Sequence, residues 1–175
     1  MLPFQRIAII GLGLIGSSLA RAIAEHMPGA RTIGHDASDR VRLRAAEIGL
    51  CDDIADSAGA AVSDADLVIL CVPVGAMGAV AAEIAADLPE DALVSDVGSS
   101  KQAVLNALRE HLPDARIVPA HPVAGTEESG PDAGFASLFH KRWCILTPDD
   151  TSLATDVEQL AAFWQGLGAD VETMP

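Results

Sequence analysis

The sequence predicts an α/β protein in which a doubly wound, mostly parallel sheet carries helices on both faces. Two observations predict this class. Apolar segments of strand length alternate with amphipathic segments of helix length along all 175 residues, as in consecutive β–α–β units. Half of the residues are hydrophobic, but only 3% are aromatic. The core is therefore expected to be aliphatic, which is typical of a parallel sheet covered by helices.

The first half of the chain contains three predicted strand–helix pairs. The run from Asp66 to Val72 is almost continuously apolar, as expected of a strand buried on both faces. Ser38 is placed to cap the second helix, and Gly49 to end it. Strands are expected at 6–10, 31–35 and 66–72, and helices at about 16–26, 38–48 and 75–87.

The second half continues the alternation around one long polar loop. Apolar residues from Leu153 to Leu167 recur at spacings of four and three, which predicts one buried helix face. Trp143 and Trp164 are expected in the core. The direction of the last two strands stays open. Strands are expected at 92–96, 116–120, 143–147 and 170–174, helices at about 101–111 and 153–167, and a Gly-rich loop at 122–134.

Charge and cysteine content exclude several classes of function. The net charge of −14 argues against a protein that binds nucleic acid or an anionic membrane. No apolar run is long enough to span a bilayer, and no basic leader precedes the first apolar stretch. Cys51, Cys71 and Cys144 are scattered, which favours neither disulfides nor a metal site and suits a reducing cytoplasm.

A glycine-rich motif follows the first predicted strand and opens the first predicted helix. In a G-x-G-x-x-G motif, the first glycine makes a tight turn and the second lets a pyrophosphate approach the backbone. The third glycine lets helix and strand pack closely. The free N–H groups of the helix N-terminus then attract the phosphates. The residues are Gly11, Leu12, Gly13, Leu14, Ile15 and Gly16. This context predicts a Rossmann-type dinucleotide site.

Asp36 ends the second predicted strand, 20 residues after Gly16. An acid at this offset accepts hydrogen bonds from the adenine ribose hydroxyls and repels a 2′-phosphate. We therefore expect NAD rather than NADP, although the nearby Arg40 is able to serve a 2′-phosphate. The simpler alternative is a glycine turn beside a surface aspartate.

Ligands of doubly wound sheets bind beyond the carboxyl ends of the strands. The small residues there that we expect to line the cofactor are Cys71, Val72 and Pro73, and the polar ones expected near the nicotinamide are Ser99, Ser100, Lys101 and His121. No neighbour is expected to lower the pKa of Cys71, so we expect it to pack beside the cofactor and not to act as a nucleophile.

His121 directly follows a predicted strand, and an imidazole there is able to accept the proton of an alcohol under oxidation. From position alone, a histidine bound only to loop backbone is equally compatible. Ser99 is a candidate to orient a substrate hydroxyl or to cap the next helix, and Lys101 to balance substrate charge or simply to stand in its first turn. The remaining histidines are expected at the surface or at helix ends: His26, His35, His111 and His140.

Four motifs together resemble the prephenate/arogenate (cyclohexadienyl) dehydrogenase family. The most specific is the stretch His121-Pro-Val-Ala-Gly-Thr-Glu127, followed by Ser129-Gly130. The others are Gly11 to Gly16 followed by Ser17-Ser18-Leu19-Ala20, then Cys71-Val-Pro73, and Asp96-Val-Gly-Ser-Ser-Lys101. The resemblance covers nearly the whole chain. Ser17 stands where the family often has glycine, and Ser100 where it often has an apolar residue.

The resemblance implies an NAD-dependent oxidative decarboxylation of prephenate or arogenate in tyrosine biosynthesis. It implies that His121 takes the proton of the ring C4 hydroxyl, that Ser99 positions this hydroxyl, and that Thr126 and Glu127 lie on the substrate side. It also implies a cytoplasmic homodimer. Family members continue into a helical domain that forms the dimer and supplies basic residues, whereas residues 1–175 correspond to the dinucleotide-binding domain. We therefore expect the 175 residues alone to be weakly active or inactive.

Two alternatives remain open on the sequence. Another small Rossmann oxidoreductase, of the 3-hydroxyacid or imine type, would leave the loop after His121 without a role. A non-catalytic NAD-binding module would use only the glycine motif and Asp36. Turnover of prephenate distinguishes both from the implied enzyme.

Overall fold

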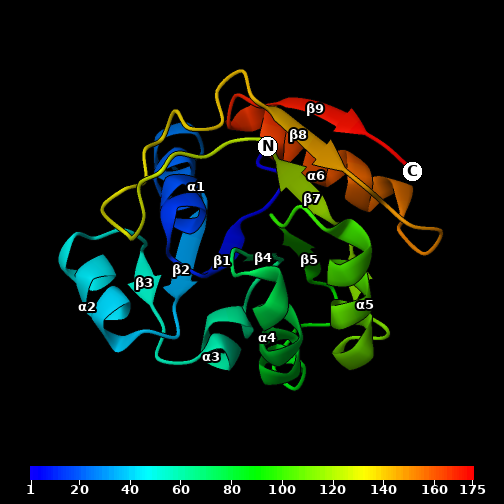
Figure 1. Ribbon diagram of the computed structural model, residues 1–175, viewed down its shortest axis with the longest axis horizontal. Helices are drawn as coiled ribbons and strands as arrows, with labels where there is room; N and C mark the ends of the chain where they lie inside the picture. The colour runs from blue at the N-terminus through cyan, green and yellow to red at the C-terminus, as the bar shows by residue number, and fades with distance from the viewer.

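The computed structural model describes residues 1–175 and contains two sheets with helices around them (Figure 1). The main sheet consists of β1 (Arg6–Ile10), β2 (Arg31–His35), β3 (Asp53–Ile54), β4 (Leu67–Leu70), β5 (Leu93–Asp96) and β6 (Arg116–Ile117). The second sheet consists of β7 (Ala120–Pro122), β8 (Trp143–Leu146) and β9 (Asp170–Thr173). The helices are α1 (Leu14–His26), α2 (Asp39–Glu47), α3 (Ala58–Val62), α4 (Met77–Ile84), α5 (Lys101–His111) and α6 (Ala154–Gly166), with a short 3₁₀ turn at Val74–Ala76.

The main sheet has the strand order β3-β2-β1-β4-β5-β6, and every neighbouring pair is parallel. The order runs outward from β1 to β3 and then reverses, so that β4 pairs with the other side of β1. This is the doubly wound, Rossmann-type order, and its ligand crevice lies where the order reverses, beyond the carboxyl ends of β1 and β4. The predicted fold class is confirmed.

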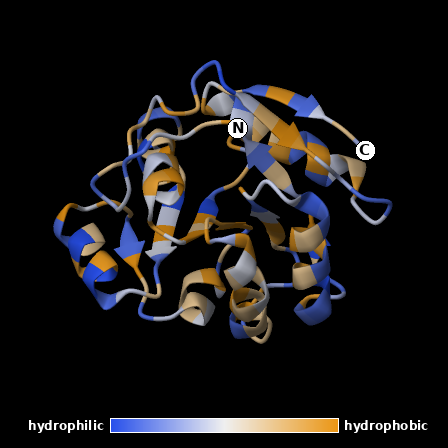
Figure 2. Ribbon diagram, viewed as in Figure 1, coloured by the Kyte–Doolittle hydropathy of each residue, from blue (hydrophilic) through white to orange (hydrophobic).

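The central strands are buried on both faces. Ile7 and Ile9 of β1 belong to a core of 26 buried residues, whereas Ala8 and Ile10 belong to a second core of 16 on the opposite face. Successive side chains of a strand alternate between faces, so one strand contributes to both cores. The helices show hydrophobic residues beside hydrophilic ones, as amphipathic helices do (Figure 2).

The second sheet departs from the sequence prediction. A single strand at 116–120 is wrong, because β6 ends at Ile117 and β7 begins at Ala120 in the other sheet. Val118 still bonds to β5 through its N–H and Val94 O (3.1 Å), and Pro119 O accepts from Thr147 N (3.0 Å). The chain therefore passes between sheets at Val118–Pro119. There β7 pairs antiparallel with β8, and β8 pairs parallel with β9.

Several smaller expectations need correction. Strand β3 and helix α3 were not predicted, because two strand residues and five helix residues are too short for a periodic pattern. The strand expected at 66–72 is limited to β4, and the helix expected at 75–87 is divided into the 3₁₀ turn and α4. None of the helices combines the length and apolarity that crossing a bilayer requires.

Two side chains lie where the sequence did not predict them. Trp143 is 55% exposed on β8 and is not a core residue. His35 is buried at the end of β2, with its Nδ1 2.9 Å from the carbonyl oxygen of Ala55, and is not a surface residue. A strand in an outer sheet exposes every second side chain, whereas His35 lies in the main sheet, paired with Ile10 of the central strand β1. Trp164 is fully buried, as predicted.

A long connection joins β7 to β8. This β7–β8 loop, residues 123–142, runs along α1 towards α2 and returns to the second sheet (Figure 1). It begins two residues after His121 and carries Thr126 and Glu127.

Trp164 provides a test of the core beneath the second sheet. Its ring packs edge-on against Phe139 and Phe163, with centroids 5.2 and 5.6 Å away, and its Nε1–H has no hydrogen-bond partner. We expect Trp164→Ala to lower the free energy of unfolding by about 3–5 kcal/mol. Trp164→Phe should cost less than half as much, because it keeps an aromatic ring and removes an unsatisfied donor. Urea unfolding measures both, and equal losses would contradict this account of the packing.

Candidate active site

The glycine turn after β1 has two crowded positions and one open position. Gly11 has a φ of +101°, and a Cβ there would lie 2.3 Å from Cys71 O. A Cβ on Gly16 would lie 1.8 Å from Gly11 O. Gly13, in contrast, has no atom within 4 Å of its Cβ position. The first and third glycines therefore allow packing within the protein, while the second leaves space beside the backbone for a ligand.

The same turn presents the start of α1 to that space. Gly13 is the N-cap of α1, and no side chain caps the helix there. The first N–H groups of a helix have no partner within it, and they carry the positive end of its dipole. The open position at Gly13 and the uncapped N–H groups of Leu14 and Ile15 together suit a phosphate group.

Asp36 lies beside the turn and stabilises it. Its Oδ2 accepts a hydrogen bond from Leu12 N (2.9 Å), and its Oδ1 accepts one from Ser38 N (2.9 Å). Each carboxylate oxygen has a second lone pair, so Asp36 is able to bind hydroxyl groups while it holds the glycine turn. Its negative charge would repel a 2′-phosphate on a ribose bound to these oxygens.

The end of β4 forms the other side of the crevice. Cys71 N donates to Ile10 O (2.6 Å). Cys71 and Val72 also pack against the glycine turn, since they are the residues that a Cβ on Gly11 would contact. Pro73 follows and is exposed. Burial raises the pKa of the Cys71 thiol well above its ordinary value, and burial raises that of Cys144 to about 12. A nucleophilic cysteine has a lowered pKa, so both thiols have packing roles.

The carboxylate of Asp96 organises the neighbouring part of the crevice. Asp96 is fully buried at the end of β5, and its Oδ2 accepts from Gly98 N (2.8 Å) and from Lys101 Nζ (2.6 Å). Its Oδ1 accepts from Ala120 N (3.1 Å), and Lys101 Nζ also donates to Ala120 O (2.7 Å). One ion pair therefore joins β5, the start of α5 and β7.

This network brings the segments of Ser99 and His121 together. Ser99 directly follows Gly98, and His121 directly follows Ala120, and both of these neighbours bind Asp96. His121 Nδ1 also lies 3.4 Å from Val97 O. A proton on Nδ1 directed at this carbonyl leaves Nε2 free to accept another proton. Ser99 is exposed and His121 is half-buried, so both residues are accessible from solvent.

Three expectations about the residues near Asp96 are corrected. The N-cap residue of α5 is Ser100, and no side-chain hydrogen bond caps the helix, so Ser99 is not a capping residue. Lys101 is bound to Asp96 and Ala120 and is not free to balance substrate charge. Its burial lowers the pKa of its ammonium, against the opposing effect of Asp96. His121 lies within β7 of the second sheet and not after a strand of the main sheet.

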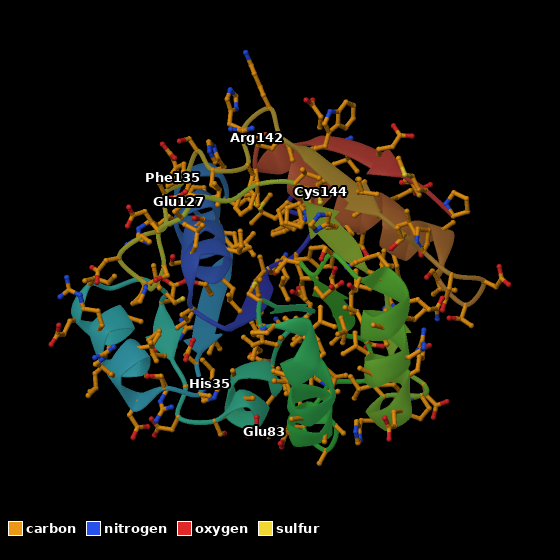
Figure 3. The ribbon with its side chains drawn as sticks, viewed as in Figure 1. His35, Glu83, Glu127, Phe135, Arg142 and Cys144 are labelled. Carbon is orange, nitrogen blue, oxygen red and sulfur yellow. The ribbon has the colours of Figure 1, made fainter.

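Thr126 and Glu127 are exposed on the β7–β8 loop. The Thr126 hydroxyl accepts a hydrogen bond from Glu128 N (3.1 Å), and the Glu127 carboxylate makes no hydrogen bond within the chain. Figure 3 shows Glu127 and Phe135 on the part of the loop beside α1, and Cys144 on β8. The structure brings neither Thr126 nor Glu127 into a hydrogen bond with His121 or Ser99.

Sequence reasoning missed the structural importance of Asp96. The available signal was a carboxylate at the end of an apolar strand with a lysine five residues later, because a buried charge requires a partner. It also missed the ion pair between Arg44 of α2 and Asp132 of the loop, which has no signal in the sequence because 88 positions separate the two residues.

The chain is similar to proteins of one known family. Residues 19–173 match the family model described as "Prephenate dehydrogenase, nucleotide-binding domain". The chain belongs to this family. A cyclohexadienyl dehydrogenase of Zymomonas mobilis is 48% identical over 174 residues, which are 99% of this chain and 59% of that relative.

Solved structures of the prephenate dehydrogenase family have the same fold. The prephenate dehydrogenase of Aquifex aeolicus, solved with hydroxyphenyl propionate and NAD⁺, has a TM-score of 0.86 and 27% identity, and the match covers 97% of this chain and 59% of that one. The arogenate dehydrogenase of Synechocystis has a TM-score of 0.89 and 26% identity over the same shares. This chain therefore spans about three-fifths of the length of these relatives.

The Asp96 network predicts a large dependence of stability on one carboxylate. We expect Asp96→Asn to lower the free energy of unfolding by about 3–5 kcal/mol, because the Lys101 ammonium would stay buried without its counter-ion. Asp53→Asn is the matched control, since it removes the partner of Arg31 in an exposed pair, and should cost at most about 1 kcal/mol. Urea unfolding compares the two variants, and similar losses would show that Asp96 is not the organising group.

Proposed function

We propose that this chain is the NAD-binding and proton-transferring part of a prephenate or arogenate dehydrogenase of tyrosine biosynthesis. The observation that carries the proposal is the Asp96 carboxylate, which holds the backbone next to Ser99 and the backbone next to His121 at the edge of the crevice. Family membership and the glycine turn support it. The reaction would oxidise the ring C4 hydroxyl to a carbonyl and release the ring carboxylate as carbon dioxide, with aromatisation as the driving force.

The residues of the crevice fit NAD. The open position at Gly13 and the start of α1 suit the pyrophosphate, and Asp36 suits the adenine ribose and disfavours a 2′-phosphate. The proposed cofactor-binding residues are Gly11, Leu12, Gly13, Leu14, Ile15, Gly16, Asp36, Cys71, Val72 and Pro73. When bound, NAD supplies the two-electron oxidant of the reaction.

His121 and Ser99 are the proposed catalytic residues. With Nδ1 directed at Val97 O, His121 Nε2 takes the proton of the substrate hydroxyl, and the Ser99 hydroxyl holds that oxygen in place. Thr126 and Glu127 are proposed to contact the substrate from the β7–β8 loop. The chain's contribution is therefore positioning together with one acid–base group.

A substrate with two carboxylates requires cationic partners. Lys101 is bound to Asp96, and Arg142 is an exposed residue that directly precedes β8. We propose that residues 1–175 form the dinucleotide-binding domain of the working enzyme. A helical domain of the kind that the family carries would add the missing cations and form a homodimer. The greater length of the relatives supports this division. We further propose that the enzyme works in the cytoplasm.

The two kinds of glycine position predict opposite effects. Gly13→Ala should leave the melting temperature unchanged, because its Cβ meets no atom within 4 Å, yet weaken NAD binding several-fold by filling the space for the pyrophosphate. Gly16→Ala should unfold the turn, because its Cβ would lie 1.8 Å from Gly11 O. Calorimetric NAD titration and thermal melts measure the two effects. Normal NAD affinity of Gly13→Ala would refute the proposed phosphate position.

His121 should determine the rate and not the affinity for NAD. In the enzyme with its helical domain, we expect His121→Asn to lower kcat by about 100- to 10,000-fold, the range for loss of a general base. Ser99→Ala should lower kcat by about tenfold or less, because it removes one hydrogen bond and no proton acceptor. Formation of NADH from prephenate measures the rate. Unchanged turnover of His121→Asn would refute the catalytic assignment.

A further inference from the structure

The β7–β8 loop is bound to the first two turns of α1, directly after the glycine turn. Arg21 Nη1 donates to Pro131 O (2.8 Å), and Phe135 N donates to the Ser18 hydroxyl (3.1 Å). Gly134 packs so closely that a Cβ there would lie 2.6 Å from Ser18 N. These contacts hold the loop to α1 on either side of Asp132, and none of them joins the loop to α2.

Helix α2 has little apolar packing of its own. Ala45 is the one buried residue among its nine. The helix begins directly after the turn at Asp36–Ser38. Asp36 Oδ1 accepts a hydrogen bond from Ser38 N, and the Ser38 hydroxyl caps α2 by accepting one from Val41 N. The position of α2 relative to the rest of the fold therefore depends strongly on polar contacts.

One such contact joins α2 to the loop. Arg44 Nε lies 3.1 and 3.0 Å from the two carboxylate oxygens of Asp132, and Arg44 Nη2 lies 2.9 Å from Asp132 Oδ1. An arginine that engages both oxygens of a carboxylate fixes its orientation as well as its distance. The Arg44 guanidinium lowers the pKa of Asp132 below its ordinary value, so both charges persist across the neutral range.

The pair therefore connects two parts of the proposed site that lie on different elements. On one side, Asp36 would bind the adenine ribose, and the chain leads from it through Ser38 into α2. On the other, Asp132 follows Thr126 and Glu127 on the loop that would contact the substrate. A ligand that fixes the turn at Asp36 fixes α2, and α2 holds the loop through Arg44.

We propose that the Arg44–Asp132 ion pair couples NAD binding at Asp36 to the ordering of the substrate-side β7–β8 loop. This inference rests on the proposed function. Arg44 and Asp132 are positioning residues, because they act through α2 and through the loop and touch neither reactant. Coupling between two sites is reciprocal, so loss of the pair should weaken NAD binding as well as loosen the loop.

Hydrogen exchange of the 175-residue chain with and without NAD tests the coupling. In the unmodified chain, NAD should slow amide exchange in the glycine turn, in α2 and in residues 126–132. In Asp132→Asn and in Arg44→Gln, NAD should still slow exchange in the glycine turn but no longer in residues 126–132. The affinity for NAD should fall by about two- to fivefold, the range of an exposed ion pair.

Glu47→Gln is the matched control. Glu47 is the other partner of Arg44, at 3.1 Å within α2, so this variant removes a carboxylate from the same arginine and leaves the link to the loop. It should behave as the unmodified chain. The double variant Arg44→Gln/Asp132→Asn should lose no more NAD affinity than either single variant, because both remove one interaction.

The outcomes separate this inference from the proposed function. If NAD binds and slows exchange in residues 126–132 equally in Asp132→Asn and in the unmodified chain, the coupling is wrong and the proposed function stands. An effect of Glu47→Gln equal to that of Asp132→Asn would also overturn the coupling, because it would assign the effect to α2 alone. If the unmodified chain binds no NAD, the proposed function fails and the coupling fails with it.

Discussion

The burial of one carboxylate imposes the arrangement of the candidate site. A charged group fully removed from water is stable only with hydrogen bonds and a counter-ion, and Asp96 has both, from Gly98, Lys101 and Ala120. These partners come from the end of β5, the start of α5 and the start of β7. Satisfying the charge therefore brings three separate elements to one point, and the two proposed catalytic residues are neighbours of those partners.

The second sheet determines where His121 lies in this arrangement. The chain leaves the main sheet at Val118–Pro119 and enters β7, so that His121 lies in a short strand paired with β8. A strand continuing in the main sheet would have carried His121 on along that sheet. The change of sheet instead places the imidazole beside Val97 O. From there the same chain continues into the loop that crosses α1 and meets α2.

The periodic elements were predictable because local sequence determines them. The limits of α5 and of β2 agree with their hydrophobic pattern, and Ser38 caps α2 as expected. The break after Ile117 was not predictable, because residues 117–120 form one apolar run and the pairing partner of each half lies far along the chain. The exposure of Trp143 was not predictable for the same reason. The sequence of β8 does not show that this strand belongs to a second sheet, or which of its faces is covered.

The sequence by itself determined the α/β class, the glycine turn and the acid at the end of the second strand, because these depend on residue types at short, regular spacings. It also supplied the histidine and serine of the candidate site through a family resemblance. Only the tertiary structure decided that Lys101 is bound to Asp96 and that Arg44 meets Asp132. A sequence does not distinguish a charged side chain that is free at the surface from one that is bound in an ion pair. A contact across 88 positions depends on how the whole chain packs.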